Sequence, residues 1–314
     1  MISTDGIESV ILPLMARDKS KTGWGGEWTE QKLLAFEKYV RAYLTIMNAY
    51  RDRYSVKWKL FYFDAFAGSG VRETENPSEQ QRWFAELGIE PEECAVYKGA
   101  AERVLAIEKR GFDEYWFVDK DKESSQSLKE RLLKNNRHNS SLFFPVGDAN
   151  EYIKKLGEQL QNKKHLKALV LFDPFGMQAS WEALTHLRNT DTDLWVLVPS
   201  GVIIGRLLKT DGTLMHPEQL TRYFGLSEKE ILPLFYAEKT EKTLFGDETR
   251  RSKIEQPTKR IAEIYVARLQ GIFKHVVTEP MVLLNSRSVP IYHFVFASNN
   301  KTATKIANDI IGKG

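Results

Sequence analysis

The run Leu60–Gly70, which reads Leu-Phe-Tyr-Phe-Asp-Ala-Phe-Ala-Gly-Ser-Gly, is the feature that most constrains the fold of this chain. An aromatic segment typical of a strand ends at Asp64 and passes directly into a turn that contains Gly68 and Gly70. Glycine has no Cβ, so the backbone of this turn can bend tightly and approach a ligand closely. Nucleotide-like ligands bind at the carboxyl ends of strands in open α/β sheets. The run therefore predicts a strand, a ligand-binding turn and a carboxylate beside it.

Short apolar segments alternate with amphipathic segments along most of the chain. The predicted strands are Lys59–Ala67, Tyr115–Asp119, Leu142–Gly147, Ala168–Asp173, Leu194–Pro199, Val276–Leu284 and Tyr292–Ala297. The predicted helices run from Glu27 to about Arg51 and over Ala100–Lys109, Ser124–Asn135, Asn150–Gln161, Trp181–Asn189, Thr258–Leu269 and Thr302–Ile311. This order predicts an α/β fold with a doubly wound, mostly parallel sheet that is buried on both faces. The polar segment Asn285–Pro290 is typical of a hairpin, so we expect an antiparallel last strand.

Shifts in this pattern divide the chain into parts. Residues 1–58 form an N-terminal arm and helix, residues 59–201 the ligand-binding core, residues 202–257 a helical insertion, and residues 258–314 the remainder of the core. Within the insertion, residues 217–232 match either a DNA-recognising helix-turn-helix or two short packing helices joined at Gly225. Residues 71–98 form either a lid over the ligand or a surface excursion. The basic residues Arg250–Lys253, Lys259 and Arg260 are diluted by acids, which favours a solvated helical face.

Composition sets the class of protein. Of 314 residues, 42% are hydrophobic and 28% are charged, as is usual for a soluble globular protein. The single cysteine, Cys94, excludes a disulfide framework and a Cys-rich metal site within this chain. No apolar run approaches the ~20 residues of a membrane span, and the acidic start does not resemble a signal peptide. We therefore expect a cytoplasmic protein without a membrane anchor, whose net charge of +3 permits nucleic-acid binding without arguing for it.

Acidic residues follow successive predicted strands at Asp64, Asp119, Asp148 and Asp173. A single Asp after a strand is commonly a turn residue or a helix cap. The carboxyl ends of parallel strands, however, share one edge of the sheet, where ligands bind. A row of acids at that edge therefore predicts a ligand site more strongly than any one of them does.

S-adenosyl-L-methionine would give each of these acids a partner. The turn at Gly68–Gly70 would pass beneath the amino-acid and ribose part of this cofactor. Asp64 would hold the ammonium group, Asp119 would accept hydrogen bonds from both ribose hydroxyls, and Asp148 would accept one from the adenine amino group. The candidate cofactor-binding residues are Asp64, Ala65, Phe66, Gly68, Gly70, Asp119, Lys120, Asp148, Ala149 and Asp173.

A dinucleotide is the competing ligand. The run Gly68–Glu73 lacks the third glycine of the dinucleotide-binding fingerprint. The ribose-binding acid of that fingerprint lies ~20 residues after the turn, whereas Asp119 lies about 50 residues after it. This spacing also departs from a minimal methyltransferase, but such a site tolerates an insertion because it has no pyrophosphate to clamp. A Walker-type phosphate loop is excluded, since no Gly-Lys-Ser/Thr follows the turn.

The run Asp64–Gly70 resembles the first motif of class I methyltransferases, in the form found in nucleic-acid amino-methyltransferases. Across most of its length the chain resembles the three-Cys-motif partner protein family (TcmP). The matching segments are Lys32–Tyr50, Phe61–Gly70, Gly99–Leu105, Tyr115–Asp121, Gly147–Asp148, Phe172–Met177 with Trp181, and Ile291–Ser298. The resemblance implies a Rossmann-type methyltransferase fold with a helical or winged-helix-like insertion. It also implies a neighbouring partner protein whose cysteine motif resembles that of radical-S-adenosylmethionine enzymes.

The residues Asp173, Pro174 and Phe175 resemble part of the Asp/Asn-Pro-Pro-aromatic motif of methyltransferases that act on adenine or cytosine amino groups. In that motif the side chain and the proline carbonyl accept hydrogen bonds from the target amino group, and the aromatic ring stacks on the base. These contacts orient the nitrogen toward the methyl group. Here the second proline is missing, so the specificity for a nucleobase stays open. The alternative is that Asp173 only orders the turn.

The sequence thus supports two hypotheses. In the first, the protein is an S-adenosyl-L-methionine-dependent methyltransferase that acts on an amino group of a nucleic-acid base or a partner, with Asp173, Pro174 and Phe175 as catalytic residues. In the second, it is a non-catalytic methyltransferase-like binding module that works with the Cys-motif partner protein. Neither hypothesis requires a metal site, and the likeness of fold alone does not separate them.

Overall fold

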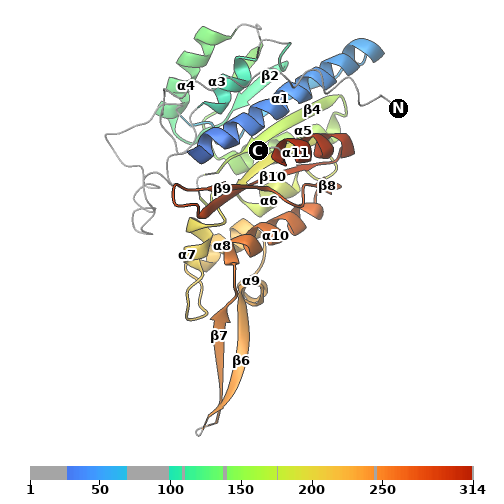
Figure 1. Cartoon of the computed structure of the whole chain (residues 1–314). Coiled ribbons are helices and arrows are strands. Elements are labelled where there is room, and N and C mark those ends of the chain that lie inside the picture. The colour runs from blue at the N-terminus through green and yellow to red at the C-terminus, as the bar shows by residue number, and fades with distance from the viewer. Residues whose placement is uncertain are drawn as a thin grey trace.

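The computed structural model describes residues 27–68, 99–107, 110–136, 140–174, 176–243 and 246–312. These residues form an 8-stranded sheet with helices on both faces and a separate two-stranded hairpin (Figure 1). The strands of the large sheet are β1 (Lys59–Asp64), β2 (Glu114–Phe117), β3 (Ser141–Phe143), β4 (Leu166–Phe172), β5 (Thr192–Val198), β8 (His275–Val276), β9 (Met281–Leu284) and β10 (Pro290–Ser298). Their order is β3-β2-β1-β4-β5-β10-β8, and β9 also pairs with β10.

The pairing of the strands confirms the predicted sheet. Strands β1 to β5 pair in parallel, whereas β10 is antiparallel to β5, β8 and β9. The predicted strand Val276–Leu284 is divided into β8 and β9, and both pair with the same edge of β10. The strand order reverses at β1, which lies between β2 and β4. Ligands bind at such a switch point in open α/β sheets, at the carboxyl ends of the strands.

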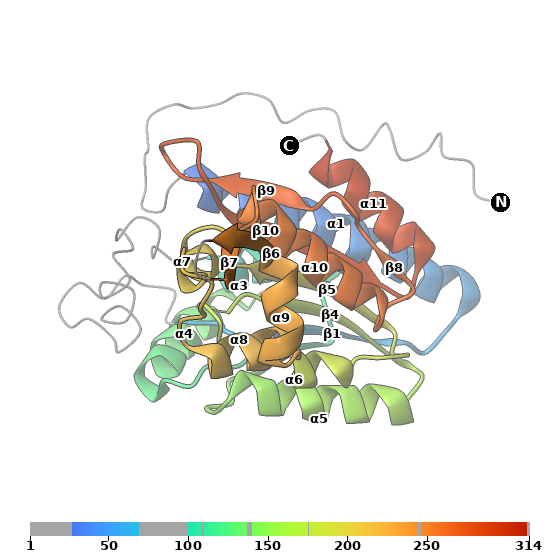
Figure 2. The same cartoon turned by 90° about the horizontal axis from the view of Figure 1, so that it is seen from below.

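Helices cover both faces because side chains of alternate strand residues point to opposite sides. The helices around the sheet are α1 (Glu27–Tyr54), α3 (Ala100–Leu105), α4 (Lys122–Asn135), α5 (Ala149–Asn162), α6 (Trp181–Thr185), α10 (Pro257–Gln270) and α11 (Lys301–Ile311). Leu60 and Tyr62 pack in the apolar cluster with α1, α3, α4 and α11, whereas Phe61 and Phe63 pack in the cluster with α5, α6 and α10. Figure 2 shows α1 and α11 on one side of the sheet and α5 and α6 on the other.

Helix α1 runs antiparallel to β1, which follows it in the chain, so its first turns lie at the carboxyl edge of the sheet. At its far end Arg51 pairs with Asp113, just before β2 begins. At its first turn the ring of Trp28 stacks on Tyr292 of β10, with 5.0 Å between ring centroids. The first turns of α1 therefore place side chains at the edge where the sequence predicts a site.

The insertion contains two strands as well as helices, whereas the sequence pattern indicated no strand within it. It comprises α7 (Val202–Leu207), α8 (Pro217–Phe224), α9 (Glu228–Phe235), β6 (Tyr236–Thr243) and β7 (Gly246–Lys253). Strands β6 and β7 form the hairpin that extends from the body in Figure 1. The expected helical face is wrong for Arg250–Lys253, which lie on β7. Their polar sequence lacks an apolar period, and cross-strand pairing such as Arg251 with Glu238 at 2.9 Å decides their structure.

The residues on both sides of Gly225 form two short helices that pack on the body. Gly225 ends α8 in the left-handed region with φ 60°, and a Cβ there would lie 2.2 Å from the ring of Trp181. The buried side chains of α8 and α9 belong to the same apolar cluster as β4 and β5. The apolar faces of α8 and α9 therefore pack into the main core. Such packing is expected of two short packing helices joined at Gly225.

Some expectations lie outside the described residues, namely those for residues 1–26, for Gly70, for the insertion at 71–98 with Cys94, and for Phe175. Within the described segments, none of the helices has the length and apolar character needed to cross a membrane. The same segments contain no group of three or more His, Cys, Asp or Glu residues that could hold a metal ion.

Candidate active site at the carboxyl edge of the sheet

Three of the predicted acids lie together at the switch point. Asp64 is the last residue of β1, Asp173 directly follows β4, and Asp119 lies two residues after β2. Asp64 is in register with Phe117 of β2 and Leu171 of β4. Asp119 and Asp173 therefore lie on either side of Asp64, each two residues further along its own chain segment. The two-residue period of a strand places all three on the α1 face, in phase with buried residues such as Tyr62.

The glycine turn is fastened to β2 by Asp119. The N–H of Gly68 donates a hydrogen bond to Oδ2 of Asp119 at 2.7 Å, and the N–H of Asp121 donates one to Oδ1 at 2.7 Å. Gly68 has φ 63°, a conformation that glycine adopts without strain. Burial raises the pKa of Asp119, and these N–H groups oppose that rise. The carboxylate is therefore held in a defined orientation beside the turn.

Asp148 has a local role that the sequence offered as the alternative. It caps α5, where its Oδ1 accepts hydrogen bonds from the backbone N–H of Asn150 at 2.8 Å and from the Asn150 side chain at 2.9 Å. The side chain of Asp148 is exposed, and the preceding N–H of Gly147 donates to the carbonyl of Asp119 at 2.9 Å. Asp148 and Ala149, the first residue of α5, thus lie next to the Asp119 loop.

Asp173 forms a buried ion pair with a residue of the N-terminal helix. Nζ of Lys32 lies 2.9 Å from Oδ2 of Asp173, and the side chains are 0% and 2% exposed. Burial raises the pKa of Asp173, and the charge of Lys32 acts in the opposite direction. Burial likewise lowers the pKa of Lys32, against the attraction of Asp173 and Asp64. The short contact thus links α1 to the end of β4.

The second oxygen of Asp173, Oδ1, is buried and has no hydrogen-bond partner among the described residues. Leaving a buried polar atom unsatisfied costs about 1–3 kcal/mol. A ligand with an N–H group at this position would remove that cost. Pro174, the next residue, is also buried.

Asp64 is also buried, and its pKa is strongly raised. Burial and the neighbouring charge of Asp173 raise its pKa to about 7, while hydrogen bonds from the N–H of Phe66 and the hydroxyl of Tyr62 oppose the rise. The Tyr62 hydroxyl lies 3.3 Å from Oδ2 of Asp64. Strongly shifted carboxyl groups that share one site are typical of functional centres. Such a cluster of like charge would favour a cationic group on a ligand.

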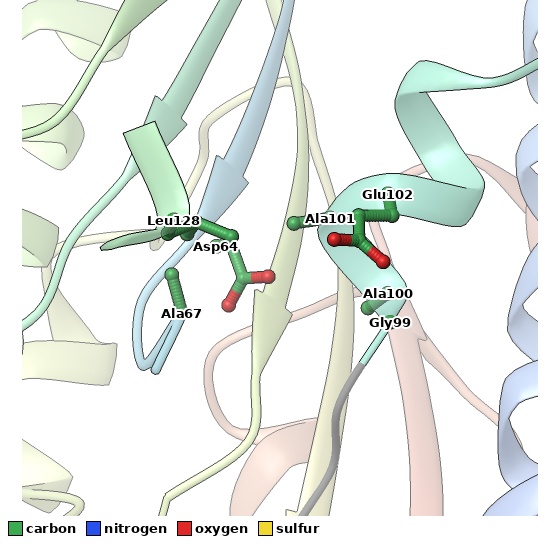
Figure 3. A pocket seen from close by; sticks show the side chains of 7 residues that line it. All are labelled: Asp64, Ala67, Gly99, Ala100, Ala101, Glu102 and Leu128. Carbon is green, nitrogen blue, oxygen red and sulfur yellow. The ribbon is translucent and has the colours of Figure 1, made fainter. Parts of the chain in front are cut away.

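A pocket opens beside Asp64 (Figure 3). It is lined by Asp64, Ala67, Gly99, Ala100, Ala101, Glu102 and Leu128. In Figure 3 the Asp64 carboxylate lies between the glycine turn and the first turn of α3. Glycine and alanine make up most of the lining.

The structure therefore brings Asp64, Asp119 and Asp173 together, with Asp148 at the end of the row. Ala65 is fully buried, and Phe66 packs its ring edge against Phe172, with 5.2 Å between ring centroids. The side chain of Lys120 is exposed.

Lys32 is a residue of this site that the strand-end motifs of the sequence did not indicate. It lies one helical turn from Trp28 and from Phe36 on the apolar stripe of α1, where a charged side chain is unusual. A charged residue on an otherwise buried stripe was the available signal. The partner of Lys32, by contrast, could not be read from local sequence, because Asp173 lies 141 residues away.

Comparison with known proteins gives only distant similarities. No family model matches the chain, and no curated protein matches it. Among solved structures, Trm1 from Pyrococcus horikoshii in complex with S-adenosyl-L-methionine has a TM-score of 0.41 at 13% identity, covering 89% of this chain and 58% of that one. LPL1258 from Legionella pneumophila has a TM-score of 0.38 at 12% identity, covering 88% and 98%. The protein yhhF from Escherichia coli has a TM-score of 0.24 at 14% identity, covering 67% and 84%.

None of these TM-scores reaches 0.5, and this chain spans 58% of the Trm1 chain. These similarities therefore assign no function to this chain.

Proposed function

We propose that this protein is an S-adenosyl-L-methionine-dependent methyltransferase that acts on an amino group, with nucleic-acid bases as the first acceptor class to test. The observation that carries the proposal is the cluster of Asp64, Asp119 and Asp173 at the switch point of the sheet, beside the glycine turn. The antiparallel β10 next to β5 is consistent with a sheet of this class. The finer assignment to the three-Cys-motif partner family, with its partner protein and a cytoplasmic location, remains a proposal from the sequence resemblance.

The carboxylates of this cluster match the ammonium, hydroxyl and amino groups of the cofactor. Asp64, buried and with its pKa raised to about 7, would hold the ammonium group, which would stabilise the ionised carboxylate. Asp119, already oriented by Gly68, would accept hydrogen bonds from the ribose hydroxyls. Asp148 and Ala149, with Lys120, would border the adenine, and Asp148 would accept from its amino group while it caps α5.

The residues around Asp173 would orient the methyl acceptor. When bound, the cofactor supplies the reactive methyl group. Oδ1 of Asp173 would accept a hydrogen bond from the acceptor amino group, and the carbonyl of Pro174 would accept a second. Phe175 would stack on a planar acceptor. Such orientation is the main contribution a protein makes to a transfer of this kind.

Calorimetry with S-adenosyl-L-methionine tests the cofactor site. We expect Asp119→Ala to lose measurable binding, because it removes both the ribose acceptor and the anchor of Gly68. The matched control is Asp121→Ala, which removes a nearby carboxylate whose role is to cap α4. Unchanged affinity in Asp119→Ala would reject the ribose assignment.

Methyl transfer tests catalysis. Nucleic acid from cells that lack the protein is incubated with the tritiated cofactor and either the wild type or Asp173→Ala. We expect incorporation with the wild type and a loss of about 100-fold or more in the variant, the scale of losing an orienting contact. Cofactor binding without transfer to RNA, DNA or protein would favour the non-catalytic binding module instead.

A further inference from the structure

We propose that Lys32 is a positioning residue for methyl transfer. Its ammonium group holds Oδ2 of Asp173, so that Oδ1 of the same carboxylate accepts a hydrogen bond from the amino group of the methyl acceptor. This inference rests on the proposed function and adds to it a residue of the N-terminal helix, outside the motifs at the strand ends. It also assigns a chemical state to the site, with Asp173 ionised when the acceptor binds.

The position of Lys32 follows from the packing of α1. Its Nζ lies 2.9 Å from Oδ2 of Asp173 and 5.4 Å from the centre of the Trp28 ring. Trp28 is itself held by stacking on Tyr292 of β10. The first turns of α1 therefore anchor the lysine, and its side chain is 0% exposed. A long, flexible side chain fixed in this way can hold a carboxylate in one orientation.

The stability of the fold does not by itself explain this pair. Two charges removed from water lose much of their hydration, and replacing a buried ion pair by apolar residues is often neutral or stabilising. The pair is also incomplete, because Oδ1 of Asp173 has no partner among the described residues. A purely structural carboxylate at this depth would ordinarily have both oxygens satisfied. In Asp173, Lys32 fixes one carboxylate oxygen and the other can accept a hydrogen bond. This arrangement is expected of a site that binds the amino group of a methyl acceptor.

The surrounding charges make Lys32 decisive for the protonation of Asp173. Asp64 on β1 attracts Lys32 and is repelled by Asp173, and Tyr62 and Asp119 in turn act on Asp64. Glu102 of α3, which pairs with Arg131, lines the pocket beside Asp64. Asp173 and Asp64 repel each other, and both are buried. Without the ammonium group, burial would favour the protonated form of Asp173. A protonated carboxyl carries a proton on one oxygen and would compete with the acceptor amino group as a donor.

The test compares Lys32→Met, which keeps length and removes charge, with Lys32→Arg, which keeps charge. The matched control is Lys38→Met, a change at an exposed position of the same helix. Far-UV circular dichroism and calorimetry with S-adenosyl-L-methionine establish folding and cofactor binding for each protein. If the wild type does not bind the cofactor, the proposed function fails, independently of Lys32.

The first readout is the ionisation of Asp173, which needs no methyl acceptor. In protein labelled with ¹³C at aspartate carboxyl groups, the signal lost in Asp173→Asn identifies this residue, and its titration is followed by NMR. We expect Lys32→Met to move the titration of Asp173 to higher pH, whereas Lys32→Arg and Lys38→Met leave it near the wild-type position. An Asp173 signal that titrates at the same pH in the wild type and Lys32→Met overturns the proposal.

The second readout is methyl transfer to the nucleic acid used above, at saturating cofactor and across pH. We expect Lys32→Met to bind the cofactor within about threefold of the wild type but to transfer methyl groups about 100-fold more slowly, as for a misoriented acceptor. Its acidic limb should move to higher pH, and Lys32→Arg should recover part of the rate. Wild-type rates and pH dependence in Lys32→Met would contradict the assignment. Should Lys32→Met fail to fold, Lys32→Gln, which also removes the positive charge, takes its place in both readouts with the same expected results.

Discussion

Asp64 should make the protein less stable as pH rises, and Asp64→Asn should remove this effect. The pKa of Asp64 is raised from 3.8 to about 7, chiefly by burial. The folded state therefore binds the proton more tightly than the unfolded state, and holds more protons between these pH values. Under this condition the free energy of unfolding falls as pH rises through the window. The stability of the neutral Asn variant has no such contribution.

The size of the effect follows from the shift. A change from 3.8 to about 7 corresponds to about 4 kcal/mol, at roughly 1.4 kcal/mol per pKa unit. Titrating groups that do not interact with Asp64 contribute equally in both proteins, so their contributions cancel in the difference. We therefore expect the free energy of unfolding of Asp64→Asn, minus that of the wild type, to increase by about 4 kcal/mol between pH 4 and pH 8.

Urea denaturation at a series of pH values measures this difference. The control is Asp121→Asn, because hydrogen bonds from Ser124 lower the pKa of that exposed helix cap, so its contribution has the opposite sign. Stability curves of wild type and Asp64→Asn that stay parallel from pH 4 to pH 8 would refute the burial argument. A cofactor with an ammonium group should stabilise the wild type more at pH 8 than it stabilises Asp64→Asn.

Other predictions concern packing and the buried polar groups. Gly225→Ala should lower the free energy of unfolding by about 2–4 kcal/mol in urea denaturation, because a Cβ would meet Trp181 and φ is 60°; Gly205→Ala, whose Cβ has no neighbour closer than 3.9 Å, should not. Equal effects of the two changes would contradict this packing. Tyr39→Phe should cost about 1.5–3 kcal/mol at pH 8, because it removes a 2.7 Å hydrogen bond to the buried carboxylate of Asp193. Burial raises the pKa of Asp193 to about 6, so this loss should shrink below that pH, and a cost independent of pH would count against it.

Local sequence determined the architecture at the switch point. The strand that ends at Asp64, the turn at Gly68 and the antiparallel β10 were all predicted, because apolar periodicity and glycine act over a few residues. The row of acids was also visible, since parallel strands bring their carboxyl ends to one edge. The same local information allowed two roles for Asp148, and the structure shows it capping α5.

Tertiary structure alone decided which side chains meet at that edge. Lys32 reaches Asp173 across 141 residues only because α1 packs antiparallel to β1 over the face that carries the acids. The hairpin of β6 and β7 likewise depends on pairing between two polar segments that have no apolar period of their own. Sequence patterns report on neighbours along the chain, whereas the partners of buried charges are set by how the layers pack.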